Sequence, residues 1–119
     1  MSIAALQYDK FKEQAVREGH VFTFTAKGEY PVFKIAGSEA IPFWSSRSRL
    51  EKIQRGYPKY KRYEIKEMSL SAFLEWIPEL DKGEVRIGAN WSGKTLKGYD
   101  VECKDLLRGL QYWIDRFKA

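Results

Sequence analysis

The chain has 119 residues and a mass of 13.9 kDa, which is enough for one hydrophobic core and too little for two domains. Hydrophobic residues make up 44% and charged residues 31%, a balance that predicts a packed globule and excludes a disordered chain. A single cysteine and a single histidine exclude disulfide scaffolds and zinc fingers. We therefore expect a single α+β domain over residues 1–119, with no cofactor and no metal site.

The sequence also predicts where the protein works. No apolar run reaches the roughly 18–20 residues that a membrane helix needs, and the N-terminus lacks the basic start and apolar stretch of a secretory signal. The lone cysteine suits a reducing compartment. We expect a cytoplasmic protein with no membrane partner.

The net charge of +5 is concentrated in one segment. Residues 45–62 contain seven basic residues and one acid, Glu51. Such a segment attracts phosphate, anionic lipid or an acidic protein surface. The alternative is a solvated face that only keeps the protein soluble.

The first third of the chain predicts a helix followed by three strands. Ser2 can cap the helix and Gly19 can end it. Residues 21–26 alternate aromatic and threonine side chains, and residues 30–36 and 40–44 continue as short strands. This order predicts a three-stranded meander.

The basic segment predicts a short helix that begins after Ser45 or Ser46 and ends near Arg55, with Leu50 and Ile53 facing inward. The remaining elements are, in order, a strand over 61–67, a helix between Ser69 and Gly83, strands over 85–91 and 95–99, and a helix capped by Asp100. Because helices and strands do not alternate strictly, we expect an antiparallel or mixed sheet of about five to six strands, with about four helices packed on it.

One stretch matches a phosphate-binding loop. Residues 88–95 fit the pattern G-x-x-x-x-G-K-[ST], whose function needs a helix directly after the loop. Gly98 falls in what would be the first helical turn, and no helical stripe follows. We predict a hairpin turn here and no nucleotide site.

The sequence offers no persuasive catalytic group, and we predict no catalytic residue. Acid pairs can be drawn, such as Glu64 with Glu67, but nothing shows that their environment raises a pKa. Cys103 has only His20 as a possible base, so a partly buried structural cysteine is the better interpretation.

The basic segment interleaves cations with aromatic side chains, a mixture that suits either a protein interface or single-stranded nucleic acid. The predicted partner-binding residues are Trp44, Arg47, Arg49, Lys52, Arg55, Tyr57, Lys59, Tyr60, Lys61 and Arg62. Trp44, Tyr57 and Tyr60 would supply apolar anchors among the cations.

Several stretches resemble a family of small bacterial proteins, the domain-of-unknown-function family numbered 2750. The most specific are residues 40–45, Ala-Ile-Pro-Phe-Trp-Ser, and residues 73–78, Phe-Leu-Glu-Trp-Ile-Pro. The resemblance runs from about Val21 to the end of the chain. It implies a bacterial cytosolic protein with no established catalytic residues, and a hairpin over residues 88–95. The dense basic run departs from what we expect of the family.

Our leading hypothesis is a non-catalytic binding protein of the immunity type, which would neutralise a toxin protein by covering an acidic surface. The step from a small bacterial protein to immunity is an analogy. The alternative is a nucleic-acid-binding accessory protein that uses the basic and aromatic segment 44–63. A small-molecule enzyme would need a pocket with perturbed carboxylates.

Overall fold

The computed structural model describes residues 2–118, which form four α-helices, one short 3-10 helix and six strands. In chain order these are α1 (Ile3–Glu18), β1 (His20–Thr25), β2 (Phe33–Ile35), β3 (Ser38–Phe43), α2 (Arg47–Gly56), η1 (Pro58–Tyr60), β4 (Glu64–Ser69), α3 (Leu70–Lys82), β5 (Val85–Ser92), β6 (Lys97–Val101) and α4 (Cys103–Lys118). The predicted α+β class is confirmed. No helix among the described residues is long and apolar enough to cross a bilayer.

The strands form two sheets rather than one. The larger has the order β2-β3-β5-β6 and is mixed, because β3 and β5 run parallel while the outer pairs are antiparallel. The smaller pairs β1 with β4. The two sheets meet at a bridge between Phe22 and Trp44, whose backbone groups exchange two hydrogen bonds of 2.8 Å.

The predicted three-stranded meander is wrong. Between β1 and the segment that follows, the structure shows one bridge, Ala26 with Glu29, and β2 pairs with β3 instead. Pro31 lies between β1 and β2 and has no amide hydrogen to donate to a ladder. All residues from Val21 to Thr25 are buried, so β1 needs cover on both faces, which a local hairpin cannot provide.

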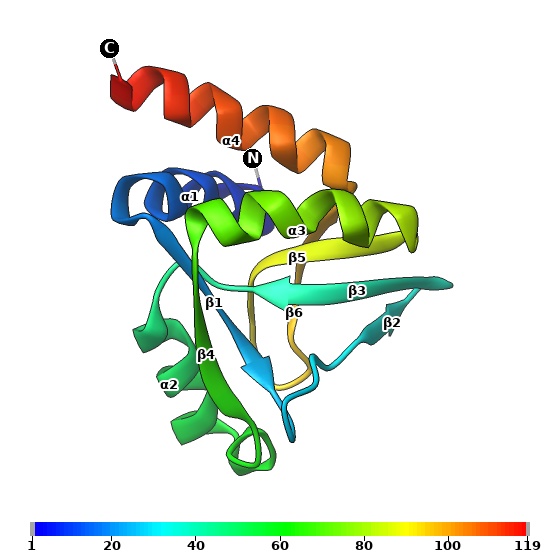
Figure 1. Cartoon of the computed structure of the whole chain (residues 1–119). Helices are drawn as coiled ribbons and strands as arrows, with labels where there is room; N and C mark the ends of the chain where they lie inside the picture. The colour runs from blue at the N-terminus through cyan, green and yellow to red at the C-terminus, as the bar shows by residue number, and fades with distance from the viewer. Residues whose placement is uncertain (1, 119) are drawn as a thin grey trace.

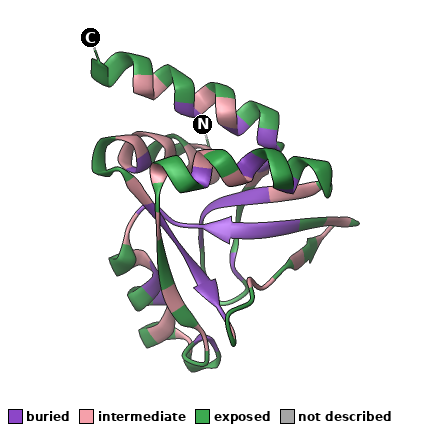
Figure 2. Cartoon of the chain, viewed as in Figure 1, coloured by how far each residue is buried: buried purple, intermediate pink, exposed green. Residues whose placement is uncertain are grey.

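Three helices cover one face of the larger sheet, and α2 lies on the other side, beside β1 and β4 (Figure 1). Two apolar clusters separate these layers. The helix-side cluster contains Phe11, Phe43, Phe73, Ile77, Ile87 and Leu106. The α2-side cluster contains Phe24, Trp44, Leu50, Ile53, Tyr60 and Trp91. Figure 2 shows buried residues along β1, β3 and β5, between the layers.

Local capping signals were mostly predicted correctly. The Ser2 hydroxyl accepts from the Ala5 amide at 3.1 Å, the Ser69 hydroxyl caps α3 in the same way, and Gly19 ends α1 with a φ of 80°. Ser46 precedes α2, but its side chain makes no capping bond.

Several predicted boundaries were wrong, and the strand predicted over 30–36 is limited to Phe33–Ile35. Asp100 does not cap α4, because it lies in β6 and binds Arg86 with its carboxylate at 2.6 Å, so the helix begins at Cys103. The strand predicted over 61–67 begins at Glu64, because η1 and a turn take up the residues before it.

The phosphate-loop pattern is a hairpin, as predicted. Its residues form β5, a turn and the approach to β6, with no helix following. The ring of Trp91 lies across Gly88 and Gly98, where a side-chain Cβ would come within 2.3 Å and 2.7 Å of ring carbons. The glycines at these two positions therefore make room for a buried indole.

Candidate docking surface

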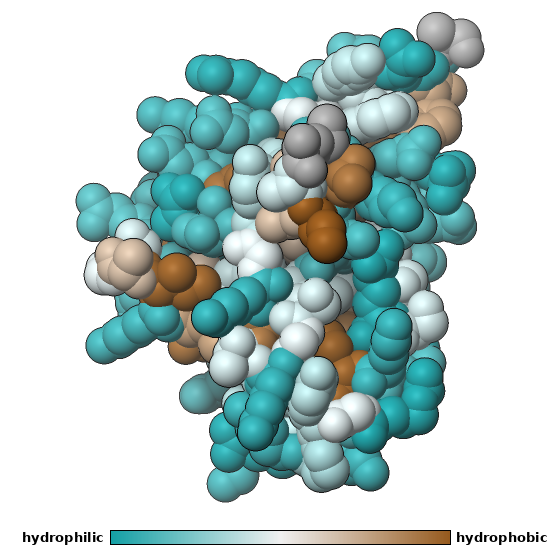
Figure 3. All heavy atoms as spheres, turned by 180° about the vertical axis from the view of Figure 1, so that it is seen from behind, coloured by the Kyte–Doolittle hydropathy of each residue, from teal (hydrophilic) through white to brown (hydrophobic). Residues whose placement is uncertain are grey.

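The helix α2 presents its cations to solvent because its apolar residues face the core. Leu50 and Ile53 are its buried side chains, as predicted, and Tyr60 of η1 is buried beside them. The six cations that remain exposed form what we call the basic surface: Arg47, Lys52, Arg55, Lys59, Lys61 and Arg62. Seen from behind in Figure 3, hydrophilic residues cover most of the molecule, and apolar areas between them are small.

Within the described chain, no cation of the basic surface has a carboxylate within 4.0 Å. This holds although Glu51 lies four residues from both Arg47 and Arg55, the spacing at which helical ion pairs form. The cations of the basic surface therefore make no direct ion pair within the described chain.

Three of these cations lie over aromatic rings. The guanidinium of Arg47 lies 5.6 Å from the centre of the Phe22 ring, and that of Arg62 lies 4.9 Å from the Tyr63 ring. Arg62 also donates to the Tyr63 hydroxyl at 2.9 Å, and the ammonium of Lys59 is 5.1 Å from the ring of its neighbour Tyr60. Cation–π contacts of this kind restrict long side chains and reduce the entropy lost on binding.

Two of the predicted apolar anchors are wrong. Trp44 is 0% exposed and donates its indole hydrogen to the Trp91 carbonyl at 2.7 Å. Tyr60 is 6% exposed and donates to the Lys94 carbonyl at 2.6 Å. Both belong to the core, because β1 and the β5–β6 turn close over them. Tyr57 is half-buried and keeps part of its ring at the surface.

Arg49 differs from the other predicted cations. It is half-buried, and its Nη1 donates to the side-chain oxygen of Gln7 on α1 at 2.8 Å. It lines a cavity of about 540 Å³ between the start of α1, α2 and the β5–β6 turn. Gln7 and Asn90, which also line this cavity, were not predicted as site residues, because nothing in their local sequence points to α2.

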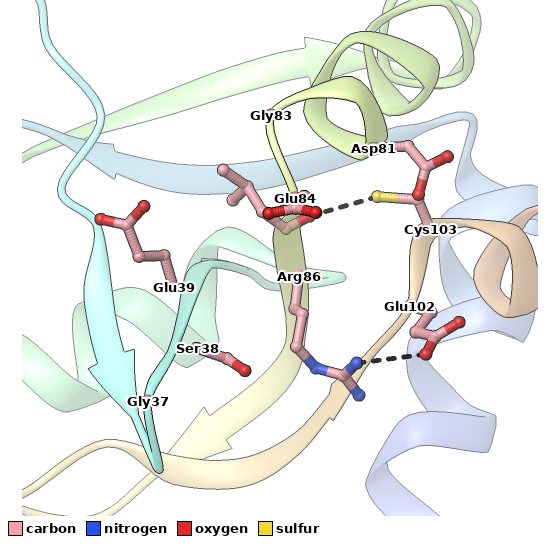
Figure 4. A pocket seen from close by; sticks show the side chains of 10 residues that line it. Gly37, Ser38, Glu39, Asp81, Gly83, Glu84, Arg86, Glu102 and Cys103 are labelled. Carbon is pink, nitrogen blue, oxygen red and sulfur yellow. Dashed lines mark hydrogen bonds and ion pairs between the residues drawn. The ribbon is translucent and has the colours of Figure 1, made fainter.

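A second cavity, of about 530 Å³, lies at the far end of the sheet and is acidic (Figure 4). Its charged lining residues are Glu39, Asp81, Glu84, Glu102 and Arg86. Among the described residues no group of three or more potential metal ligands is found. Arg86 pairs with Asp100 and Glu102, so its charge is already matched.

Cys103 also lines the acidic cavity and is not paired with His20. Its thiol donates to the Val85 carbonyl at 3.3 Å, while His20 lies beside Glu67 at 3.7 Å. Burial, reinforced by the charge of Asp81, raises the pKa of the thiol to about 11. A thiol of that kind is protonated at neutral pH and is a poor nucleophile.

Fold and site together define a small α+β protein with six exposed cations on and beside α2 and η1. The chain belongs to the protein family of unknown function DUF2750, whose family model matches residues 8–110. The match includes the whole basic surface and excludes the first five residues of α1 and the second half of α4. No curated protein matches the chain.

Proposed function

We propose that this chain is a non-catalytic binding protein that docks the basic surface onto an acidic surface of a protein partner, in the manner of an immunity protein that blocks a toxin. The observation that carries the proposal is the set of six exposed cations without a carboxylate partner in the described chain, on and beside two consecutive helices anchored to the core. An acidic partner would supply the counter-charges that the described part of the chain does not.

The mechanism is occlusion guided by charge. Long-range attraction speeds the encounter and sets the orientation, and short-range ion pairs then hold the partner in place. Cations already resting on the rings of Phe22, Tyr60 and Tyr63 lose less freedom on docking than free side chains do. With Trp44 and Tyr60 buried, affinity depends on these charges and on the exposed part of Tyr57.

The test uses the proteins encoded next to this chain in its genome. Each is co-expressed with the chain, and both growth and co-purification are measured. A neighbour that is toxic alone, harmless in the presence of the chain and co-purified with it supports the proposal. If no neighbour is toxic or bound, the immunity hypothesis fails.

A variant set assigns the effect to the basic surface. Neutralising Arg47, Arg55 and Lys61 to glutamine lowers the net charge from +5 to +2. The matched control neutralises Lys10, Lys34 and Lys104, which are exposed on other elements and lack ion pairs within the described residues. Exposed pairs contribute about 0.2–1 kcal/mol each, so the first variant weakens binding roughly 3- to 150-fold and the control changes it little.

Nucleic acid is the alternative partner, and a separate titration tests it. Single- and double-stranded oligonucleotides are titrated at two salt concentrations. Binding that weakens steeply with salt and is lost in the triple variant would replace the protein-partner proposal with the nucleic-acid one.

A further inference from the structure

The cavity beside Arg49 carries an inference that goes beyond the docking surface and does not rest on it. Its walls come from α1, α2 and the β5–β6 turn, and its volume of about 540 Å³ lies within the range of small-molecule sites. The residues that matter for recognition are Ile3, Gln7, Arg49, Lys52, Tyr57 and Asn90. None of the described residues that line it is acidic.

Arg49 differs from the other half-buried cations of the described chain because it has no carboxylate partner. Three lysines and arginines of the described chain are half-buried: Lys12, Arg49 and Arg86. Lys12 pairs with Asp9 at 3.4 Å and Arg86 pairs with Asp100 at 2.6 Å. Arg49 alone among these three has no carboxylate within 4.0 Å.

The guanidinium of Arg49 is therefore half-buried, and one hydrogen bond to the described protein leaves its other hydrogens open to solvent or to a ligand. A guanidinium carries five N–H donors, and one of them reaches Gln7. Burial lowers the pKa of Arg49 from its ordinary value, which is the expected sign for a desolvated cation without a counter-ion. A bound anion would satisfy these donors and restore the lost solvation.

A buried polar network fixes the cavity's inner wall. The side-chain oxygen of Asn90 accepts from the Ser45 amide at 2.9 Å, and its amide group donates to the Gln7 carbonyl at 3.3 Å. The Ser45 hydroxyl in turn donates to Gln14 of α1 at 2.5 Å. Asn90 adopts a φ of 51° at an irregularity in the β5–β6 pairing, and such bulges re-aim side chains beside sites. The network places Gln7, and through it Arg49, at a defined position.

The rest of the lining suits a flat apolar group. Tyr57 is half-buried at the C-terminal end of α2, and Ile3 and Ile53 contribute aliphatic surface. Lys52 adds a second positive charge on the same wall as Arg49. Two cations favour a dianion, and an arginine matches the oxygens of a phosphate with two parallel hydrogen bonds.

We propose that this cavity binds a small organic phosphate monoester, with the phosphate between Arg49 and Lys52 and an apolar or aromatic body against Tyr57. Arg49 is the specificity-determining residue, because a ligand must accept hydrogen bonds from its guanidinium and balance its charge. Lys52 adds charge, and Gln7 orients the guanidinium.

The test titrates the full chain with phenyl phosphate at about physiological salt, with phenol and inorganic phosphate as probes for each half of the ligand. Binding is followed by calorimetry and by NMR signals of the side-chain amides of Gln7 and Asn90. We expect saturable binding of phenyl phosphate with a Kd below about 1 mM. Phenol and inorganic phosphate should each bind at least roughly tenfold more weakly, since each lacks one set of contacts.

The variants separate a site from diffuse attraction. Arg49→Gln should weaken phenyl phosphate binding roughly 10- to 100-fold, as expected for a hydrogen bond to a charged group. Arg55→Gln removes the same charge from an exposed position of α2 and should change the affinity less than about twofold. If Arg49→Gln fails to fold, Lys52→Gln takes its place, with an expected loss of roughly 2- to 5-fold.

Two results would overturn the proposal. One is the absence of saturation by about 10 mM phenyl phosphate. The other is an equal loss of affinity in Arg55→Gln and in the variant of the cavity cation, which would show diffuse attraction alone. Neither result bears on docking of a protein partner, whose assay does not include a small phosphate.

Discussion

Replacing Gly88 by alanine puts a methyl group into space that the Trp91 ring already fills. The new Cβ would lie 2.3 Å from one ring carbon and 2.4 Å from another, whereas non-bonded carbons rest about 3.5–4.0 Å apart. The ring must therefore move by about 1 Å or more. It is 1% exposed, so it has no solvent to move into without opening the β5–β6 hairpin.

The expected loss of stability follows from two effects. Overpacking a buried site typically costs about 1–3 kcal/mol. A displaced ring also loses the hydrogen bond from its indole nitrogen to the Tyr99 carbonyl, now 2.7 Å, which adds about 1 kcal/mol. We expect Gly88→Ala to lower the free energy of unfolding by about 2–4 kcal/mol.

The measurement is urea unfolding followed by circular dichroism and tryptophan fluorescence. Gly56→Ala is the matched control, because no atom lies within 4 Å of its added Cβ and its φ is ordinary. The control should be neutral or up to about 1 kcal/mol more stable. Unchanged stability in Gly88→Ala would contradict the reasoning. If, in addition, the wild-type protein bound a nucleotide and the variant did not, the phosphate-loop interpretation would have to be considered again.

Ser69→Ala should lower the free energy of unfolding by about 0.5–2 kcal/mol, because it removes the cap on the Ala72 amide. Ser46→Ala, at the matching position before α2, should change it by only a few tenths of a kcal/mol, because that side chain makes no capping bond; equal losses in urea unfolding would refute the distinction. The Cys103 thiol should react far more slowly with iodoacetamide at pH 8 in the folded protein than in urea, since its pKa is raised to about 11. Because the unfolded chain releases that proton first, the thiol's contribution to stability should be lost as the pH rises from about 9 to about 11. Cys103→Ala should show a smaller decline over that range, and an identical decline would contradict the assignment.

Local features were predicted well because local chemistry determines them. Ser2, Gly19 and Ser69 act within a few residues of the chain, and each does what its type and position suggested. The inward direction of Leu50 and Ile53 followed from helical geometry alone. The number of strands and helices follows from the same local signals.

Features that depend on distant partners were not predicted. The pairing of β1 with β4, and the use of Asp100 by Arg86, depend on which segments the tertiary fold brings together. The parallel pairing of β3 with β5 has the same origin. Alternation along β1 could not reveal that both of its faces are covered.

In the candidate site, too, some residues were predicted from local sequence and others were not. Its cations were identified from sequence because charged side chains on a short amphipathic helix must face water. The role of the aromatic residues was not predicted correctly, because a segment that mixes cations and rings does not indicate which rings face inward. Trp44 and Tyr60 are buried in the core, whereas Tyr57 is half-buried and keeps part of its ring at the surface. The hydrogen bond from Arg49 to Gln7 joins α2 to α1, and neither local sequence predicts it.

The most direct test of the central claim is the association rate constant with the partner found by co-expression, measured at low and at physiological salt. The account predicts that neutralising Arg47, Arg55 and Lys61 slows association roughly tenfold or more at low salt and removes most of its salt dependence, while the variant at Lys10, Lys34 and Lys104 stays near wild type. Equal rates in all three proteins would show that the basic surface plays no part in binding.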